Sequence, residues 1–523
     1  MTAEHELLRT FQKLKSLSSL AGLKNGKALH YLACLVDLAA RYDDPESTDK
    51  ALAWAAELKS RKLSASDQIS LSYFTANAWG DKQNFRHRNA DEAWKWEQPE
   101  TLNQMLCLRR ARRHPYFQQW DGVRQAQVLT NLGNQLDTLG RFVEALAHWN
   151  DALAVKPEFG MARGNRGMGL FIYSNLLFDP YHKAPFYVAA YRDLEFALSS
   201  KANFEGYSDA QAKEAFQRTR EKIASIADIS KLEHSYNLAD FSLGDSEAEQ
   251  RYRKWALSER LFLNPLNDLG PYPAAGADTF VLPTFTTKLS EPPTWLGFFN
   301  QLKQEYVSAR WTFYEGSKAT NAHFSDRDVR LYNRLDYPVY GIGAERVRMA
   351  FQMAYSLFDK IGFFLNDYMR LKIPETQVYF RKLWFKPDST ELRAEFAQLQ
   401  NLPWRGLYWL SKDLFDKKLK ATADPDAQEL YKLRNRLEHS YLKLHDIGSG
   451  NQPGDLFHDR MAHSLGYGEF ERRTLRVLKL ARAALIYLAL GMEREERSRA
   501  AQGGAGGLSM PMTMDTFDDD WKH

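Results

Sequence analysis

Cysteine is almost absent from this sequence, which has Cys34 and Cys107 as its only two among 523 residues. Two cysteines in no paired spacing exclude a disulfide framework and a cysteine-based zinc site within one chain. Such sparse use of cysteine is typical of proteins in a reducing compartment. We therefore expect a cytoplasmic protein.

Long hydrophobic runs and phosphate-binding glycine loops are absent as well. The longest apolar run, AALIYLALGM, is too short and too rich in alanine to span a bilayer, and the stretch MTAEHELLRTFQKLK lacks the apolar core of a secretory signal. No glycine loop of the Walker type occurs, so ATP hydrolysis by that route is not supported. We expect no membrane association and no cofactor.

The sequence also has no large excess of charge of one sign, since the net charge is only +4. A value this small for the length does not indicate coating of nucleic acid by bulk positive charge, although it leaves room for a local basic patch. One group of histidines and aspartates matches no standard zinc spacing, so we predict no metal site there. Its members are His445, Asp446, His458, Asp459 and His463.

Apolar residues are plentiful, and they recur at helical spacing. Hydrophobic residues make up 44% and aromatics 13%, which is typical of a folded globular protein. Glycine and proline are sparse before residue 260, whereas FLNPLNDLGPYPAAGADTFVLPTF marks a boundary. We predict an all-α protein in four parts: a helical repeat region at 1–260, a connector at 261–299, a helical bundle at 300–495 and a flexible tail at 496–523.

The segment VLTNLGNQLDTLGRFVEALAHWNDALAVKP resembles a tetratricopeptide (TPR) repeat, with its clearest match over residues 126–159. Small and large residues fall at the offsets that let two antiparallel helices pack closely: Leu132, Gly133, Leu136, Gly140, Ala145, Trp149, Ala152 and Pro157. A degenerate copy follows, with Gly167 in the small position. Since one repeat cannot bury its own faces, we expect several divergent repeats in a TPR-like α-solenoid. The alternative is a general helical domain with one chance match.

Two long amphipathic helices are expected in the bundle. The first has a continuous apolar stripe, formed by Val347, Phe351, Ala354, Phe358, Ile361, Leu365 and Tyr368. The second lies in ADPDAQELYKLRNRLEHSYLKLH, with Asp424 as its expected N-cap and with Leu430, Leu433, Leu437, Tyr441 and Leu444 on its buried side. At about 100° per residue, His439 lies almost opposite these leucines, on one face with Asn435, Tyr431 and Leu442. That face is either an ordinary solvated surface or a site.

Arg434, Asn435 and His439 give this second helix a motif of arginine, polar residue, three residues, histidine. The spacing alone is weak evidence, because RRARRH at Arg109–His114 matches it too. Together with HFSDRDVRLYNRLDYP and the long helix after it, the motif resembles the HEPN superfamily, specifically a bacterial subgroup with TPR-like helices ahead of the bundle. The resemblance covers roughly residues 300–490.

The resemblance implies a metal-independent endoribonuclease that acts on RNA, formed when two HEPN domains pair. Since the bundle has one good motif, a homodimer is implied, commonly as a toxin or antiviral defence effector whose attached domain senses or restrains. Histidine suits proton transfer near neutral pH and arginine suits a phosphate, so we assign these roles to His439 and Arg434, and orientation to Asn435. Five residues place Arg434 about 140° around the helix from His439, nearer the leucines.

Further candidates for contact with RNA or phosphate are Arg436, His323 and Arg327. The alternative for His323 and its neighbours is capping and turn chemistry. The run Arg109–His114 is either a phosphate contact or, as we favour, a solvated helix end. A partner protein or ligand on the TPR-like region is expected. The rival for the whole chain is a non-catalytic TPR/HEPN scaffold that binds a protein or a nucleotide.

Overall fold

The computed structural model describes residues 3–205, 210–288, 290–332, 336–419, 421–446, 459, 461–502 and 511–522. Helices dominate these residues, as predicted, and their only strands are β1 (Tyr441–His445) and β2 (Ala462–Gly466). None of the helices in this part of the chain is both long and apolar enough to cross a bilayer. The all-α fold class is confirmed.

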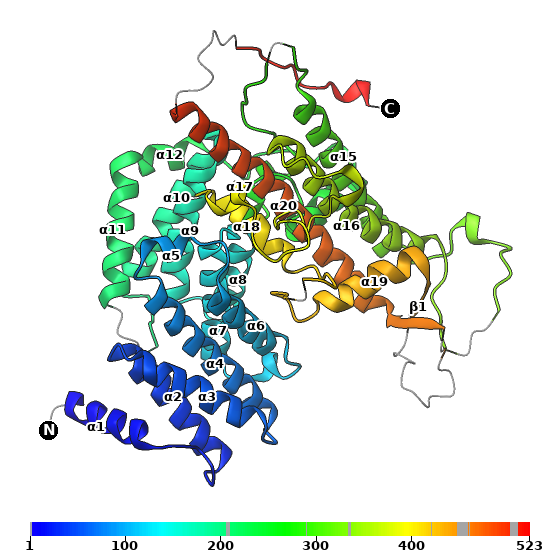
Figure 1. Cartoon of the computed structure of the whole chain (residues 1–523). Helices are drawn as coiled ribbons and strands as arrows, with labels where there is room; N and C mark the ends of the chain where they lie inside the picture. Colours follow the sequence, from blue (N-terminus) through cyan, green and yellow to red (C-terminus); the bar gives the residue numbers. More distant parts are fainter. Residues whose placement is uncertain are drawn as a thin grey trace.

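The N-terminal part is a succession of helices, most of which pack against a helix that is near in the sequence (Figure 1). These helices are α1 (Ala3–Ser16), α2 (Asn25–Arg41), α3 (Pro45–Lys59), α4 (Ala65–Arg86), α5 (Ala90–Trp94), α6 (Pro99–Arg113), α7 (Gly122–Thr138), α8 (Phe142–Val155), α9 (Gly160–Leu176), α10 (Pro180–Leu198), α11 (Ala210–Ile226), α12 (Ile229–Ser235), α13 (Glu247–Ser258) and α14 (Leu266–Leu269). Short 3-10 turns occur at Phe117–Gln119 (η1) and Pro273–Ala275 (η2).

Small residues of the TPR-like pattern let these helices approach closely. A Cβ on Gly133 of α7 would lie 2.6 Å from Nε1 of Trp149 on α8, and a Cβ on Gly167 of α9 would lie 2.8 Å from Cγ of Leu194 on α10. The Trp149 indole is buried and donates to Oδ1 of Asn134 over 2.9 Å. This packing is consistent with TPR-like helix pairs.

The C-terminal part is a bundle built around one long helix, α20. Its helices are α15 (Thr294–Ser317), α16 (Ile342–Tyr368), α17 (Ala394–Ala397), α18 (Leu402–Ser411), α19 (Ala427–His439) and α20 (Tyr467–Ala501), with 3-10 turns at Phe324–Asp326 (η3), Glu375–Gln377 (η4) and Asp519–Trp521 (η5). The apolar stripe predicted for α16 is buried as expected, and α15, α16 and α18 all pack on α20. Since α20 continues to Ala501, the tail predicted from residue 496 begins later than expected.

The two parts of the chain share one hydrophobic core. A single cluster of buried side chains extends from Ile69 to Met492, while a smaller one lies within the first four helices. Trp96 is buried against the rings of Trp384 and Tyr408, and its Nε1 donates to the carbonyl of Leu399 over 3.1 Å. The N-terminal helices and the bundle therefore fold against each other as one unit.

Two glycines bring the backbones of the two parts close together. Gly140, in the turn between α7 and α8, has a φ of +88°, and a Cβ on it would overlap the carbonyl oxygen of Leu402. A Cβ on Gly406 of α18 would in turn overlap the carbonyl of Gly140. The TPR pattern therefore supplies, at Gly140, both a left-handed turn and a backbone contact with the bundle.

We predict that Gly140→Ala destabilises the protein more than Gly22→Ala does. Both residues have positive φ, but Gly22 has no atom within 4 Å of an added Cβ, so only Gly140→Ala adds a clash to the conformational strain. The clash should cost roughly 1–3 kcal/mol beyond the control. Urea unfolding of the two variants measures this difference. Equal losses would mean that the glycine contact does not constrain the two parts.

Candidate functional site

Helix α19 carries the predicted motif, but it is shorter than predicted. It ends at His439, and Tyr441–His445 form β1, which pairs in parallel with β2. The prediction of helix through Leu444 is therefore wrong, as is the placement of Leu442 on the face of His439. Leu442 and Leu444 are buried within a strand whose partners, including the backbone N–H of Val339 that donates to the Leu444 carbonyl over 2.8 Å, come from distant segments.

The start of α19 also differs from the prediction. Asp426 is the N-cap, whereas Asp424, which we expected there, is buried two residues earlier. Oδ1 of Asp424 accepts from the backbone N–H of Asp426 over 2.8 Å. Leu430 and Leu433 are buried, as the apolar spacing predicts. Because these two leucines face the core, the opposite face of α19 points away from it.

His439 is the last residue of α19, and its side chain is 75% exposed. Arg434 is only 32% exposed, and its guanidinium lies 5.8 Å from the centre of the Tyr355 ring. This is the flank position that the helical geometry predicts for Arg434. Burial raises the pKa of Tyr355, while the charge of Arg434 acts in the opposite direction.

Glu438 links the two motif residues. Its Oε1 lies 3.1 Å from Nε of Arg434, and its Oε2 lies 3.5 Å from Nε2 of His439. Sequence reasoning missed this residue, although its position four residues after Arg434 and directly before His439 is a signal for such pairing. Arg434 and His439 are thereby held on one surface despite the angle between them.

This arrangement can support proton transfer and bind an anion. The imidazole of His439 is accessible at the C-terminal end of α19, and imidazole is a side chain that transfers protons near neutral pH. Arg436 is exposed nearby and donates to Oγ of Ser440 over 2.7 Å. On β2, burial lowers the pKa of His463, with the charge of Glu429 opposing the shift and that of Arg436 adding to it.

Residues 286–495 match the model of the LA2681-like HEPN family. This region is a HEPN domain. The match begins inside the connector predicted for 261–299. Comparisons with curated proteins and with solved structures find no match.

The other predicted contacts of the HEPN domain lie in the segment before α16. Nδ1 of His323 accepts from the backbone N–H of Ser325 over 3.2 Å, and Oδ2 of Asp326 accepts from that of Ile342 at the start of α16 over 2.9 Å. Both therefore serve as caps, which is the alternative given for this group. Arg327 is exposed. No contact among the described residues joins His323 or Arg327 to the motif of α19.

The histidine and aspartate group after α19 is only partly described, because His458 lies outside the described residues. His445 is buried and its Nδ1 lies 2.8 Å from the carbonyl oxygen of Asp336. In the part of the chain that the structure describes, no three histidine, cysteine, aspartate or glutamate side chains are grouped so that they could hold a metal ion.

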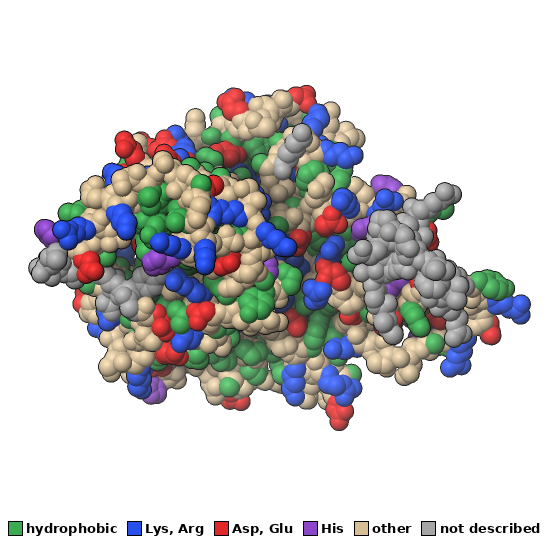
Figure 2. Space-filling model, turned by 90° about the horizontal axis from the view of Figure 1, so that it is seen from below, with side chains coloured by type: hydrophobic (Ala, Val, Ile, Leu, Met, Phe, Trp, Pro, Cys, Tyr) green, Lys and Arg blue, Asp and Glu red, His purple; other side chains and the backbone are tan. Residues whose placement is uncertain are grey.

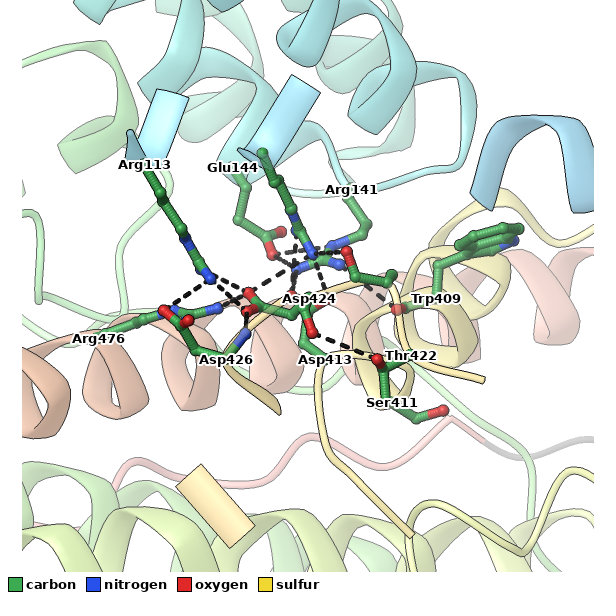
Figure 3. Close-up of polar contacts among 12 residues, drawn as sticks. Arg113, Arg141, Glu144, Trp409, Ser411, Asp413, Thr422, Asp424, Asp426 and Arg476 are labelled. Carbon is green, nitrogen blue, oxygen red and sulfur yellow. Dashed lines mark hydrogen bonds and ion pairs between the residues drawn. The ribbon is translucent and has the colours of Figure 1, made fainter. Parts of the chain in front are cut away.

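Two of the four arginines of RRARRH, Arg109 and Arg113, lie in the interface with the HEPN domain, and Figure 3 shows the contacts of Arg113. Arg109 is buried, with Nη1 lying 2.5 Å from Oδ1 of Asp413, and Nη1 of Arg113 lies 2.6 Å from Oδ1 of Asp424. The preferred interpretation as a solvated helix end is wrong for these two residues, and a free phosphate contact is excluded as well. Their partners are more than three hundred residues away in the sequence, so local pattern could not reveal them.

Two buried carboxylates, Asp413 and Asp424, organise this interface. Arg141, in the turn before α8, lies 2.7 Å from Oδ2 of Asp413, and Arg476 of α20 pairs with Asp424 (Figure 3). Burial alone raises the pKa of the Asp413 carboxyl, but the charges of Arg109 and Arg141 outweigh it and hold that pKa well below its usual range. Asp424 lies two residues before the N-cap of α19, so the network reaches the start of the motif helix.

We predict that Asp413→Asn destabilises the protein by about 3–5 kcal/mol at neutral pH, because Arg109 and Arg141 lose the buried carboxylate that they share. Among the described carboxylates, Arg141 then keeps only Glu144, and Arg109 keeps only Asp424 at 3.6 Å. Asp49→Asn, which breaks an exposed pair with Lys82, should cost less than about 1 kcal/mol. Urea unfolding measures both.

The parent protein and Asp413→Asn can also be compared as a function of pH. Since the native pKa of Asp413 lies below its unfolded value of about 3.9, its stabilisation is complete above that pH and declines as the pH falls below it. The difference between the parent and Asp413→Asn should therefore shrink below about pH 4. A difference that does not change with pH would contradict the ionised state assigned to Asp413.

Proposed function

We propose that this protein is a metal-independent endoribonuclease of the HEPN type. The observation that carries the proposal is the exposed imidazole of His439 at the end of α19, with Arg434 held beside it by Glu438 in a HEPN domain. In the reaction the 2′-oxygen of RNA attacks the adjacent phosphorus and the 5′-oxygen leaves. The products are a 2′,3′-cyclic phosphate and a 5′-hydroxyl.

The residues have separate tasks in this reaction. His439 takes the proton of the 2′-hydroxyl or supplies one to the leaving 5′-oxygen, as an imidazole does near neutral pH. Arg434 stabilises the negative charge that develops on the phosphate, and Arg436 adds to the positive field. Asn435 orients the imidazole or the phosphate. Glu438 keeps Arg434 in place until the phosphate competes for its guanidinium.

A homodimer completes the proposed site. One motif lies in the bundle of each chain, on a surface that is open to a second copy. Two HEPN domains that pair through this surface bring two motifs onto one RNA. The proposed cellular role is that of a regulated toxin or an antiviral defence effector.

The N-terminal helices are proposed to sense a trigger and to regulate the site. Arg113 of α6 pairs with both Asp424 and Asp426, and its Nη1 lies 2.6 Å and 2.7 Å from their carboxylate oxygens. Asp426 is the N-cap residue of α19, so a protein or ligand that displaces α6 also displaces the motif helix. This contact supports regulation from the N-terminal part.

A non-catalytic scaffold is the second candidate function. The pairing of Arg434 with Glu438 favours it, because a guanidinium that is already neutralised binds phosphate less strongly. In that case the HEPN domain would bind a protein partner or a nucleotide without cutting RNA. The variants below separate the two functions.

We predict that His439→Ala abolishes RNA cleavage and leaves the unfolding transition unchanged, since the side chain is 75% exposed. Loss of an acid or base typically lowers a rate by about 100-fold to 10,000-fold. The matched control is His114→Ala, in the second sequence match to the motif. Cleavage of total bacterial RNA, followed on gels, measures the rates. Equal rates for parent and His439→Ala would make the assignment of His439 wrong.

We predict that Arg113→Ala slows cleavage about tenfold or more, because it frees the start of α19 and displaces the motif. Arg112→Ala is the matched control on the same helix, since Arg112 pairs only with Asp151 of α8 among the described residues. Single-turnover cleavage rates at saturating RNA compare the two. If both variants cut RNA at the parental rate, α6 does not act on the site through this ion pair.

A further inference from the structure

A segment between α15 and α16 extends away from the bundle beside β1 (Figure 1). We name its described residues, 322–332 and 336–341, the aromatic arm. Six of its large apolar side chains are exposed, with Tyr332 at 83% and Phe324 at 73%. The others are Val329, Leu331, Tyr337 and Tyr340. At this end of the molecule the surface carries hydrophobic and basic side chains together (Figure 2).

The described arginines of the aromatic arm face solvent, while two of its three described acidic side chains are bound by other parts of the protein. Arg327 and Arg330 are exposed and make no ion pair among the described residues. Asp326 caps α16, and Asp336 is buried and paired with Lys443. Asp328 is the one described acid of the arm that is exposed. The solvent-facing surface of the arm therefore combines rings with a positive balance of charge.

The base of the aromatic arm is fixed beside the motif. The N–H of Val339 donates to the carbonyl of Leu444 over 2.8 Å, and the N–H of Asp446 donates to the carbonyl of Tyr337 over 3.1 Å. Tyr340 contacts Tyr441, whose pKa is raised to about 12, first by burial and then by the hydrogen bond with Tyr340. Tyr441 follows His439 by two residues. The arm thus leads away from the end of α19, where the imidazole is exposed.

We propose that the aromatic arm binds single-stranded RNA and guides it to His439, an inference that rests on the proposed function. Exposed rings on both sides of two exposed arginines, Arg327 and Arg330, suit a single strand, since bases stack on the rings and phosphates contact the arginines. Stacking of this kind tolerates any base, so the arm selects single strands and not a sequence. A face that binds a second protein copy would instead need a compact apolar centre.

The test measures binding apart from cleavage. The full-length His439→Ala protein is titrated into a fluorescein-labelled single-stranded RNA roughly 15 nucleotides long, and anisotropy gives the Kd. Adding Phe324→Ala and Tyr332→Ala should raise the Kd about tenfold for each ring removed. Tyr181→Ala, at 75% exposed, is the matched control for ring removal and should leave the Kd unchanged. All four positions are at the surface, so the variants should fold.

A second pair of substitutions tests the charges of the arm. Arg327→Gln with Arg330→Gln should lower the slope of log Kd against log salt by about 1.4, as expected for two phosphate contacts to a single strand. Arg218→Gln, an exposed arginine of α11, is the control and should leave the slope unchanged. A duplex of the same sequence should bind more weakly than the single strand and respond less to the ring variants.

Two results would overturn the proposal. The first is an unchanged Kd in the ring variants. If these variants also elute from a size-exclusion column as a smaller particle than the parent, the arm contacts a second copy of the protein and not RNA. The second is a duplex that binds as well as the single strand. Failure of the proposed function looks different: the parent and His439→Ala would then both leave RNA uncut, whatever the arm variants do to the Kd.

Discussion

The buried ion network at Asp413 and Asp424 is the constraint on which the rest of the structure depends. Guanidinium groups from α6, from the turn before α8 and from α20 surround these carboxylates. A buried charge without a partner is strongly destabilising, so any shift between the N-terminal helices and the HEPN domain breaks several pairs at once. The network therefore allows one relative position of the two parts and holds the chain segment that leads into α19.

Other contacts at this interface reinforce that position. Gly140 and Gly406 bring two backbones together, and the side chain of Tyr487 on α20 accepts from the N–H of Val143 over 3.1 Å. The rigid part of the molecule thus ends at the core face of α19, where Leu430 and Leu433 are buried. The opposite face of α19 and the arm beside it remain open. A site at this boundary is anchored on one side and accessible on the other, as binding of a large substrate requires.

Sequence could predict those features that depend on local pattern. The apolar stripe of α16, the small-to-large pairing of Gly133 with Trp149 and the burial of Leu430 and Leu433 on α19 follow from spacing and are found. Tyr441, which we expected on the same buried side, is 39% exposed. The end of α19 could not be predicted in this way. Leu437, Tyr441 and Leu444 continue the helical spacing, but pairing with β2 and with residues 337–339 makes a strand from Tyr441 onward.

In the candidate site, too, some features could be predicted from local spacing and others could not. The positions of Arg434 and His439 on the helix follow from rotation per residue, and Glu438 could have been found from its spacing to Arg434. The ion pairs of Arg109 and Arg113 could not be predicted, because their partners lie more than three hundred residues away in the sequence. A run of charged residues is usually exposed to solvent, whereas these two arginines pair with buried carboxylates. Long-range ion pairs are decided by tertiary packing, and a single sequence carries little trace of them.

The measurement that tests the central claim most directly is the chemistry of the RNA ends. Purified protein is incubated with RNA in excess EDTA, and the fragments are examined for their terminal groups. The account predicts cleavage under these conditions, with 2′,3′-cyclic phosphate on one fragment and 5′-hydroxyl on the other. Cleavage that EDTA abolishes, or fragments that carry 5′-phosphate, would contradict it.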